Sequence, residues 1–156
     1  MSPEELQYVE DFGAYMEALG ASRMAGRVWG TLIISEEAEM TAAQIAEELG
    51  ASAGSISSAT RSLIGFGMVD RRRRPGDRKD YFAVRPDSYI TLLRRREHAI
   101  EMFTDLIRRG LLLVGDRELP NRRLSEFEEF YIWLSDRFHL LINEWHEERS
   151  HRSEHT

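Results

Sequence analysis

Positive charge is concentrated in one short stretch of the sequence, RRRRPGDRK, which runs from Arg71 to Lys79. Six of its nine residues are basic, and a Pro-Gly pair divides them. Guanidinium groups bind phosphates and base edges through paired hydrogen bonds, so the stretch indicates binding of a polyanion. The alternative is a solvated charged hairpin without a partner. In that case Arg71 to Arg74 would repel one another, because the sequence offers no acidic neighbours sufficient to cancel their charge.

The formal net charge of −6 conceals a strong asymmetry along the chain. Residues 1–60 carry −8, residues 61–96 carry +7 and residues 97–156 carry −5. A basic block in an acidic body indicates a polyanion held at one place, since the rest of the chain would repel it. Duplex DNA supplies the matching charge, about one phosphate per 1.7 Å of its axis. The pattern therefore favours DNA binding over the solvated hairpin.

The composition narrows the class of protein. The chain of 156 residues fits one domain or a small domain with an appendage, and 42% hydrophobic residues suffice for a core. It has no apolar run long enough to span a membrane and no signal-peptide pattern, so we expect a cytoplasmic protein. The absence of cysteine excludes disulfides and thiolate zinc sites. No catalytic or nucleotide-binding motif is present, so we predict neither an enzyme nor a cofactor.

Four helices are predicted before the basic stretch, with ends near residues 19, 35, 49 and 65. Each begins with a residue whose side chain can cap it: Ser2, Ser22, Thr41 and Ser52. Residues 68–74 and 79–85 then indicate two strands, joined through a turn at Pro75-Gly76-Asp77. The order helix, turn, helix, hairpin is that of a winged helix-turn-helix, with the basic hairpin as its wing.

The second helix of this pair buries Ile56, Ala59 and Leu63 by its spacing. Its predicted exposed residues are small hydroxyls and one arginine: Ser55, Ser57, Ser58, Arg61 and Ser62. Small side chains let a helix lie deep in the major groove, where hydroxyls bond phosphates or base edges. A serine-rich surface helix without a partner is the alternative. The adjacent wing favours the DNA-binding interpretation.

Two further helices are predicted after the hairpin, from residue 87 or 88 to 114 and from 122 to 148, with a loop at 115–121. Seven apolar residues of the last helix alternate in spacings of three and four: Leu124, Phe127, Tyr131, Leu134, Phe138, Leu141 and Trp145. Such a seam is typical of a helix that packs along a partner. Tyr8, Phe12 and Tyr15 of the first helix are predicted to meet it in a dimer.

From Ser22 to Val84 the sequence resembles the multiple-antibiotic-resistance regulator (MarR) family of bacterial proteins, and more closely its GbsR-type branch. The resemblance covers about forty per cent of the chain. It is carried by these segments: Ala25-Gly26-Arg27 with Gly30, Gln44 to Gly50, Gly54-Ser55-Ile56-Ser57, and Pro75 to Phe82. Family members often carry a basic residue or proline where this chain has Ala53, which puts one phosphate contact in doubt.

The resemblance implies a homodimeric transcriptional regulator, usually a repressor, that binds double-stranded DNA at an inverted repeat. We expect a mainly α fold with a small β-hairpin wing. Residues 20–86 would form the DNA-binding domain, residues 1–19 and 87–150 the dimerisation region, and residues 151–156 a frayed tail. The resemblance also makes Arg78 the wing-tip arginine that enters the minor groove. The predicted DNA contacts are Ser52, Gly54, Ser55, Ser57, Ser58, Arg61, Arg72, Arg74, Arg78 and Lys79.

The sequence offers two further candidate sites, an effector pocket and a metal site, and each has a simpler explanation. Some GbsR-like regulators bind quaternary ammonium ligands in aromatic boxes, and Phe12, Tyr15, Trp29 and Phe103 could line such an effector pocket. The helical spacing of these rings favours an ordinary core. His139 and His146 lie seven residues apart on one helix, but no compact ligand set accompanies them, so we predict no metal site.

A protein of another class could share these features. A winged-helix module that binds a protein partner through the seam would place the basic wing on an acidic surface. Such a module would not need an exposed serine-rich helix and an intact wing tip together, and this combination favours DNA.

Overall fold

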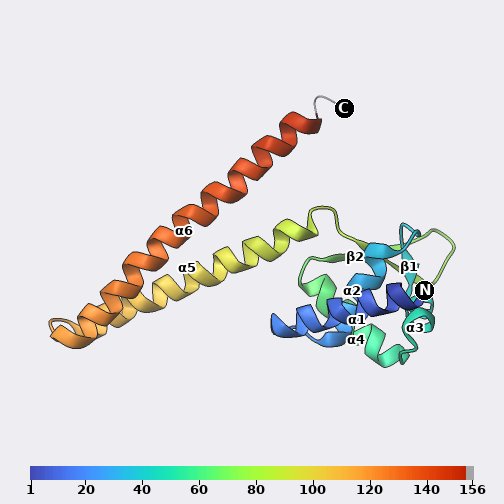
Figure 1. The fold of residues 1–156 in the computed structure, drawn as a ribbon, viewed down its shortest axis with the longest axis horizontal. Helices are drawn as coiled ribbons and strands as arrows, with labels where there is room; N and C mark the ends of the chain where they lie inside the picture. Colours follow the sequence, from blue (N-terminus) through green and yellow to red (C-terminus); the bar gives the residue numbers. More distant parts are fainter. Residues whose placement is uncertain (154–156) are drawn as a thin grey trace. The chain divides into compact units, whose positions relative to one another are not determined.

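The computed structural model describes residues 1–153, which form six helices and one small sheet (Figure 1). This confirms the predicted mainly α fold with a β-hairpin wing. The chain divides into two compact units, an N-terminal unit of residues 1–91 and a C-terminal unit from Leu92 onward. The elements are α1 (Pro3–Ala18), α2 (Arg23–Ile34), β1 (Met40–Thr41), α3 (Ala42–Leu49), α4 (Ala53–Gly65), β2 (Val69–Arg73), β3 (Asp80–Val84), α5 (Ser88–Val114) and α6 (Glu118–Ser153).

The four predicted caps all start helices in the N-terminal unit. The side chain of Ser2 accepts a hydrogen bond from the N–H of Glu5, and Ser22, Thr41 and Ser52 accept theirs three residues on in the same way. Each bond satisfies one of the N–H groups that a helix leaves unpaired in its first turn. Gly50 ends α3 in the left-handed conformation at φ 57°. The sequence therefore fixes where the helix-turn-helix begins and turns.

Helix α1 packs directly on α2, within the same compact unit as the winged domain. The contact is close because it is made at glycines: a Cβ added at Gly26 would lie 2.7 Å from Cα of Gly13. The buried face of α1 is formed by Val9, Gly13 and Met16. The predicted boundary near residue 19 therefore does not separate two compact parts. Tyr8 and Tyr15 lie on the outer face, with 43% and 53% of their surface exposed.

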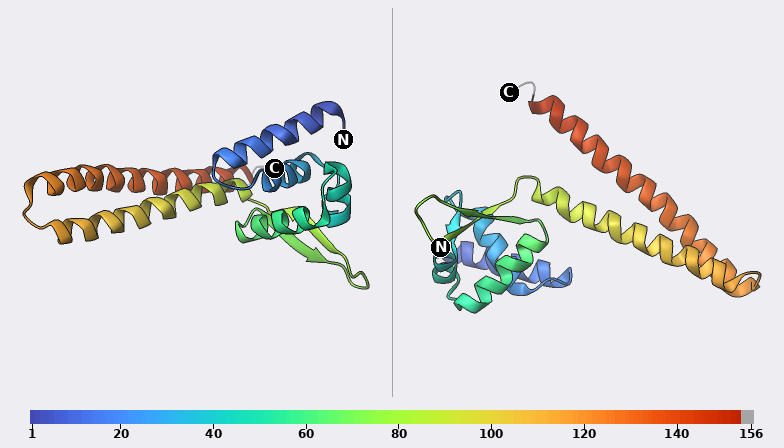
Figure 2. Two further views of the ribbon diagram at one scale, coloured as in Figure 1. Left: turned by 90° about the horizontal axis from the view of Figure 1, so that it is seen from below. Right: turned by 180° about the vertical axis from the view of Figure 1, so that it is seen from behind.

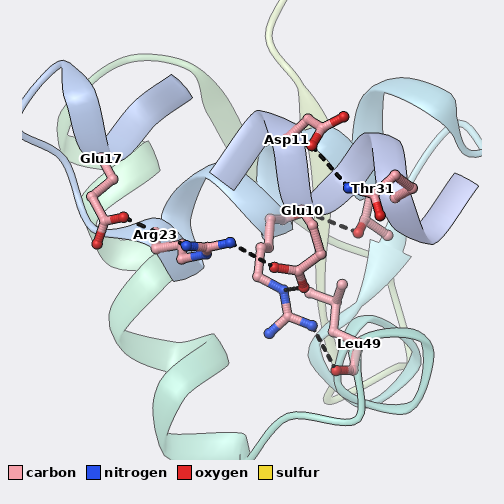
Figure 3. Close-up of polar contacts among 8 residues, drawn as sticks. Glu10, Asp11, Glu17, Arg23, Thr31 and Leu49 are labelled. Atoms are coloured by element: carbon pink, nitrogen blue, oxygen red, sulfur yellow. Dashed lines mark hydrogen bonds and ion pairs between the residues drawn. The ribbon is translucent and has the colours of Figure 1, made fainter. Parts of the chain in front are cut away.

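Ion pairs join α1 to α2, and one of their arginines also donates a hydrogen bond to α3 (Figure 3). Nε of Arg27, on α2, lies 2.7 Å from a carboxylate oxygen of Glu10 on α1, and its Nη2 donates to the carbonyl of Leu49 at 3.1 Å. Arg23 reaches Glu10 and Glu17 at 3.3 and 3.7 Å. Because Leu49 is the last residue of α3, the arginine ties the helix before the turn to both preceding helices.

The sheet has the order β1-β3-β2, and both pairings are antiparallel. Strand β1 is not predicted by the sequence. It pairs Met40 with Phe82 and Thr41 with Tyr81. The hairpin of β2 and β3 is one residue shorter at each end than predicted, and it projects from the N-terminal unit (Figure 2). The sheet packs on α4, with Val69 and Phe82 buried.

The C-terminal unit consists of α5 from Leu92 onward and α6, joined by a short turn at Gly115, where φ is 55°. The prediction of a loop over residues 115–121 was wrong, because α6 already begins at Glu118. Pro120 lies in the first turn of α6, where a proline removes no internal hydrogen bond. At the other end the helix continues to Ser153, so residues 151–153 of the predicted frayed tail are helical. Residues 154–156 lie outside the described residues.

The predicted seam of α6 divides between two directions. Tyr131 packs against Phe103 of α5 with ring centroids 4.7 Å apart, and Leu124 lies against Gly110. Ile142, which the seam omitted, is 4% exposed. Phe127 also meets Phe103 edge-to-face, with ring centroids 6.4 Å apart, yet it stays 52% exposed, and Leu141 is 54% exposed. Part of the seam therefore closes the α5–α6 pair within one chain. The rest of the seam stays exposed as a separate apolar surface. Within residues 1–153, no helix is both long and apolar enough to cross a bilayer.

Candidate nucleic-acid interface

Helix α4 presents a polar face, as predicted. Ile56, Ala59 and Leu63 are buried, whereas Ser57, Ser58 and Arg61 are exposed. Ser55 and Ser62 are partly buried, and Gly54 and Ala53 are exposed in the first turn. The hydroxyl of Ser52 accepts the N–H of Ser55 at 3.2 Å, so this serine is occupied as the helix cap.

The arginines of the wing alternate between its two faces, since successive side chains of a strand point in opposite directions. On one face, Nε of Arg73 donates to Oδ1 of Asp80 at 2.9 Å, and Arg71 lies 3.6 Å from the other oxygen of that carboxylate. Asp80 stands directly across the hairpin from Arg73. The hydrogen bond from Arg73 lowers the pKa of Asp80, which keeps the carboxylate ionised.

On the other face, Arg72 and Arg74 share the carboxylate of Glu39. Arg74 approaches Oε1 through Nε at 2.8 Å and through Nη2 at 2.6 Å, and Arg72 lies 3.8 Å from Oε2. The side chain of Glu39 is only 13% exposed. The hydrogen bond to Glu39 raises the pKa of Arg74. Each face of the wing therefore carries its own counter-charge, and the expectation that no acidic neighbours offset Arg71 to Arg74 was wrong.

The wing tip is held by a second set of contacts. Gly76 takes a positive φ of 78° in the turn, a conformation that favours glycine. Asp77 accepts the backbone N–H of Lys79 at 2.9 Å and the hydroxyl of Tyr81 at 2.7 Å, and these bonds lower the pKa of Asp77. The guanidinium of Arg74 lies 4.1 Å from the centre of the Tyr81 ring. The residues on both sides of Arg78 are thus fixed before any ligand binds.

Three basic side chains of the predicted interface stay unpaired. Arg61, Arg78 and Lys79 form no ion pair with any residue between 1 and 153. Arg61 and Lys79 line a groove of about 420 Å³ between α4 and the wing, together with Ser57 and Arg71. The structure therefore brings the polar face of α4 and one face of the wing into a single basic concavity.

A second groove, of about 440 Å³, lies on the opposite face of the wing and has a different character. It is lined by Arg74 and Lys79 but also by three glutamates, Glu37, Glu39 and Glu47. Glu39, the residue that distinguishes the two faces, was not predicted from the sequence. It lies 35 positions from Arg74, and a single glutamate before a two-residue strand gives no local signal.

The aromatic residues predicted for an effector pocket fall in different units. Phe12 packs edge-to-face on Trp29 with ring centroids 5.2 Å apart, and Trp29 is 4% exposed, so these two rings are part of the core. Tyr15 adjoins Phe12 at 6.1 Å. Phe103 packs in the C-terminal unit against Tyr131. The buried indole N–H of Trp29 has no hydrogen-bond partner within the described part of the chain.

Comparisons with known proteins agree with this geometry. The model of the MarR family matches residues 32–81, which include α3, α4 and most of the wing. The model described as "MmpR5-like MarR family transcriptional regulator" matches residues 87–148. The HTH-type transcriptional regulator MmpR5 of Mycobacterium tuberculosis (strain ATCC 25618 / H37Rv) is 33% identical over 135 residues, which cover 86% of this chain and 82% of that protein. The chain belongs to the MarR family.

Two more relatives extend this MarR assignment. The putative HTH-type transcriptional regulator YvaV of Bacillus subtilis (strain 168) is 27% identical over 148 residues, covering 84% of this chain and 83% of that one. A crystal structure of a transcriptional regulator superposes with a TM-score of 0.79 at 31% identity, over 93% of this chain and 99% of its own. As a MarR protein, the chain is a DNA-binding transcriptional regulator with a winged helix-turn-helix, in a family of regulators rather than enzymes. The likeness to the GbsR-type branch stays a prediction.

Proposed function

We propose that this MarR regulator binds an inverted repeat in double-stranded DNA as a homodimer and represses transcription there. The observation that carries the proposal is the basic concavity in which α4 presents Ser57 and Arg61 beside the unpaired Lys79 of the wing. Hydroxyl and guanidinium groups on a helix suit the major groove, and Arg78 at the narrow tip suits an adjacent minor groove.

The proposed DNA contacts are those expected from the sequence, with an order of importance added. Arg61, Arg78 and Lys79 come first because they form no ion pair with any residue in the described range 1–153. Arg72 and Arg74 come second, since a phosphate must draw them away from Glu39. Serines discriminate bases weakly, so groove shape at the wing positions should contribute much of the specificity.

The proposed homodimer rests on the apolar surface of the C-terminal unit. Phe127, Phe130 and Trp133 of α6 are each more than half exposed, and Leu112 and Leu113 of α5 are more than 80% exposed. A patch of this kind marks an association site in proteins. Tyr8 and Tyr15, exposed on α1, are proposed to contribute to the same dimer.

A small-molecule effector that relieves repression is the least constrained element of the proposal. It rests on the resemblance to GbsR-type regulators and on the unpaired indole N–H of Trp29 beside Phe12 and Tyr15. A ligand with a hydrogen-bond acceptor would satisfy that buried donor.

The experiment that tests the function is binding to duplexes with altered half-site spacing, after the operator has been mapped on DNA upstream of the gene. A two-fold dimer presents two α4 helices to one face of the duplex, so its half-sites should lie about 10 base pairs apart or a multiple of that. Inserting half a helical turn should reduce affinity to near the non-specific level. Equal affinity for the lengthened duplex would contradict the symmetric dimer, and failure to bind any duplex would contradict DNA binding.

A further inference from the structure

The second groove of the wing, which contains Glu37, Glu39 and Glu47, points to a role for Glu39. This role goes beyond the proposed DNA contacts and rests on the proposed function. Glu39 directly precedes β1, which is an edge strand of the sheet, and its side chain is only 13% exposed beside the two arginines that it binds. The partners are unequal: Arg74 lies within hydrogen-bond distance, whereas Arg72 makes a longer contact of 3.8 Å. One carboxylate thereby offsets two guanidinium groups of the face that bears Tyr81.

We propose that Glu39 limits non-specific DNA binding by competing with phosphates for Arg72 and Arg74. In the free protein both guanidinium groups are held at the carboxylate. A phosphate that binds either arginine must replace Glu39, so each such contact gains less free energy than a contact made by an unpaired side chain. The basic surface that attracts any duplex is then confined to Arg61, Arg78 and Lys79. Glu39 is therefore a positioning residue: it holds Arg72 and Arg74, and it thereby increases the preference for specific over non-specific DNA.

The charge of the neighbouring residues supports this competition. Glu37 and Glu47 line the same groove as Glu39, so a duplex that entered it would meet three carboxylates. The groove between α4 and the wing contains one carboxylate, Asp80, among Arg61, Arg71 and Lys79. Docking from the side of α4 is therefore electrostatically favoured, and Glu39 reduces the positive charge of the other face of the wing, where Arg72 and Arg74 are the secondary contacts.

The test compares Glu39→Gln with Glu37→Gln in the full-length protein, using a random-sequence duplex as the probe. Both substitutions remove one negative charge from the same groove, but the Glu37 carboxylate forms no ion pair with any described residue. Glu39→Gln should raise affinity for the random duplex roughly three- to tenfold, the effect of releasing one or two ion pairs whose arginines are about half exposed. Glu37→Gln should raise it by less than about twofold at physiological salt, because only screened long-range repulsion is lost.

Two further readouts separate competition from a general effect of charge. The slope of log affinity against log salt should steepen by up to about 0.9 for each arginine that Glu39→Gln releases. Adding Arg74→Ala to Glu39→Gln should cancel most of the gain, so Arg74→Ala should cost more affinity in the Glu39→Gln protein than in the wild type. Thermal melting of each variant confirms that the comparison is made between folded proteins.

Several outcomes would overturn the inference while leaving the proposed function intact. Equal gains for Glu39→Gln and Glu37→Gln would show that only net charge matters. A loss of affinity in Glu39→Gln would show that the carboxylate is needed to hold the wing. A gain that survives the addition of Arg74→Ala would assign the effect to other residues. Wild-type protein that binds no duplex even at low salt would instead contradict the proposed function itself.

Discussion

The two units of this protein use apolar residues in opposite ways. In the N-terminal unit they form a closed core: among residues 1–153, every buried apolar residue belongs to it except Ile100, Ile107 and Ile142. The C-terminal unit leaves most of its large apolar residues exposed, among them Phe130 and Trp133 of α6. A helix of 36 residues is about 54 Å long, more than α5, with 27, can cover by itself.

This difference indicates which of the two units can be stable on its own. The helices of the N-terminal unit pack around a sheet, so its apolar faces are satisfied within one chain. The C-terminal unit is a single layer of two helices, and a single layer cannot bury both of its faces. In the proposed homodimer a second copy of the chain would cover this exposed surface, whereas the charged surface of the winged unit would meet DNA.

Breaking the apolar surface of the C-terminal unit should have the largest effect. Phe130 and Trp133 lie side by side on α6, with ring centroids 6.2 Å apart, and both are more than half exposed. We expect Phe130→Asp with Trp133→Asp to weaken self-association about a hundredfold or more, since carboxylates buried in an apolar interface cost several kcal/mol. Light scattering over a concentration series measures the shift from dimer to monomer.

A charge-matched variant controls this experiment. Ser125→Asp with Asn143→Asp adds the same two charges at exposed polar positions of α6 and should leave the dimer unchanged. Leu134 and Phe138 of the same helix are less suitable for such a test, because both are half-buried and their replacement would disturb the fold of one chain. A dimer that persists in the Phe130/Trp133 variant would place the interface elsewhere.

Alanine substitution of one glycine in each unit should change the free energy of unfolding by different amounts. A methyl group at Gly26 would lie 2.7 Å from the carbonyl oxygen of Phe12, a backbone atom that cannot move away alone. We expect Gly26→Ala to destabilise the protein by about 1–3 kcal/mol. At Gly110 the nearest atom is Cδ1 of Leu124 at 3.2 Å, the end of a flexible side chain. Gly110→Ala should be neutral or stabilising by up to about 1 kcal/mol, because alanine favours the helix.

Urea unfolding of the two variants beside the wild type measures this difference. Similar midpoints for Gly26→Ala and Gly110→Ala would mean that the crossing of α1 and α2 can relax, and the closed core would be looser than described.

The smallest effects are expected in the wing, where they should leave the dimer intact. Arg78→Ala removes an unpaired guanidinium and should weaken binding to a duplex with A·T-rich flanks by roughly tenfold. Arg74→Ala removes one already paired with Glu39 and should weaken it by less than about threefold. Fluorescence anisotropy with labelled duplexes gives both affinities. Equal losses in the two variants would remove the distinction between paired and unpaired arginines.

Local signals in the sequence predicted most of the N-terminal unit. Each cap, such as Thr41 and Ser52, acts on an N–H three residues away, and the turn at Gly76 needs only its immediate neighbours. Strand β1 was missed because two residues carry no periodicity. Its partner β3 is distant in sequence, and Thr41 is more visible as the cap of α3. The polar face of α4 followed from spacing alone, whereas the pairing of Arg74 with Glu39 did not.

The C-terminal unit shows a different limit of sequence analysis. Spacing identified apolar residues of α6 but not the surface that each of them would meet. Leu124 and Tyr131 pack toward α5, whereas Leu141 is 54% exposed. A heptad pattern is satisfied by any apolar partner, within the chain or outside it, so the pattern alone cannot assign the partner.

Strand β1 also has a consequence for the order in which the chain folds. It joins Met40 to Phe82, so the sheet closes only after a long loop that includes α3 and α4 has been brought together. The entropy of closing that loop must be overcome before the pairing is formed, whereas the helices need only local contacts. On a ribosome, α1 to α4 can form while β3 is still being synthesised. The part of the protein that carries Arg78 is then the last part of the winged unit to take shape.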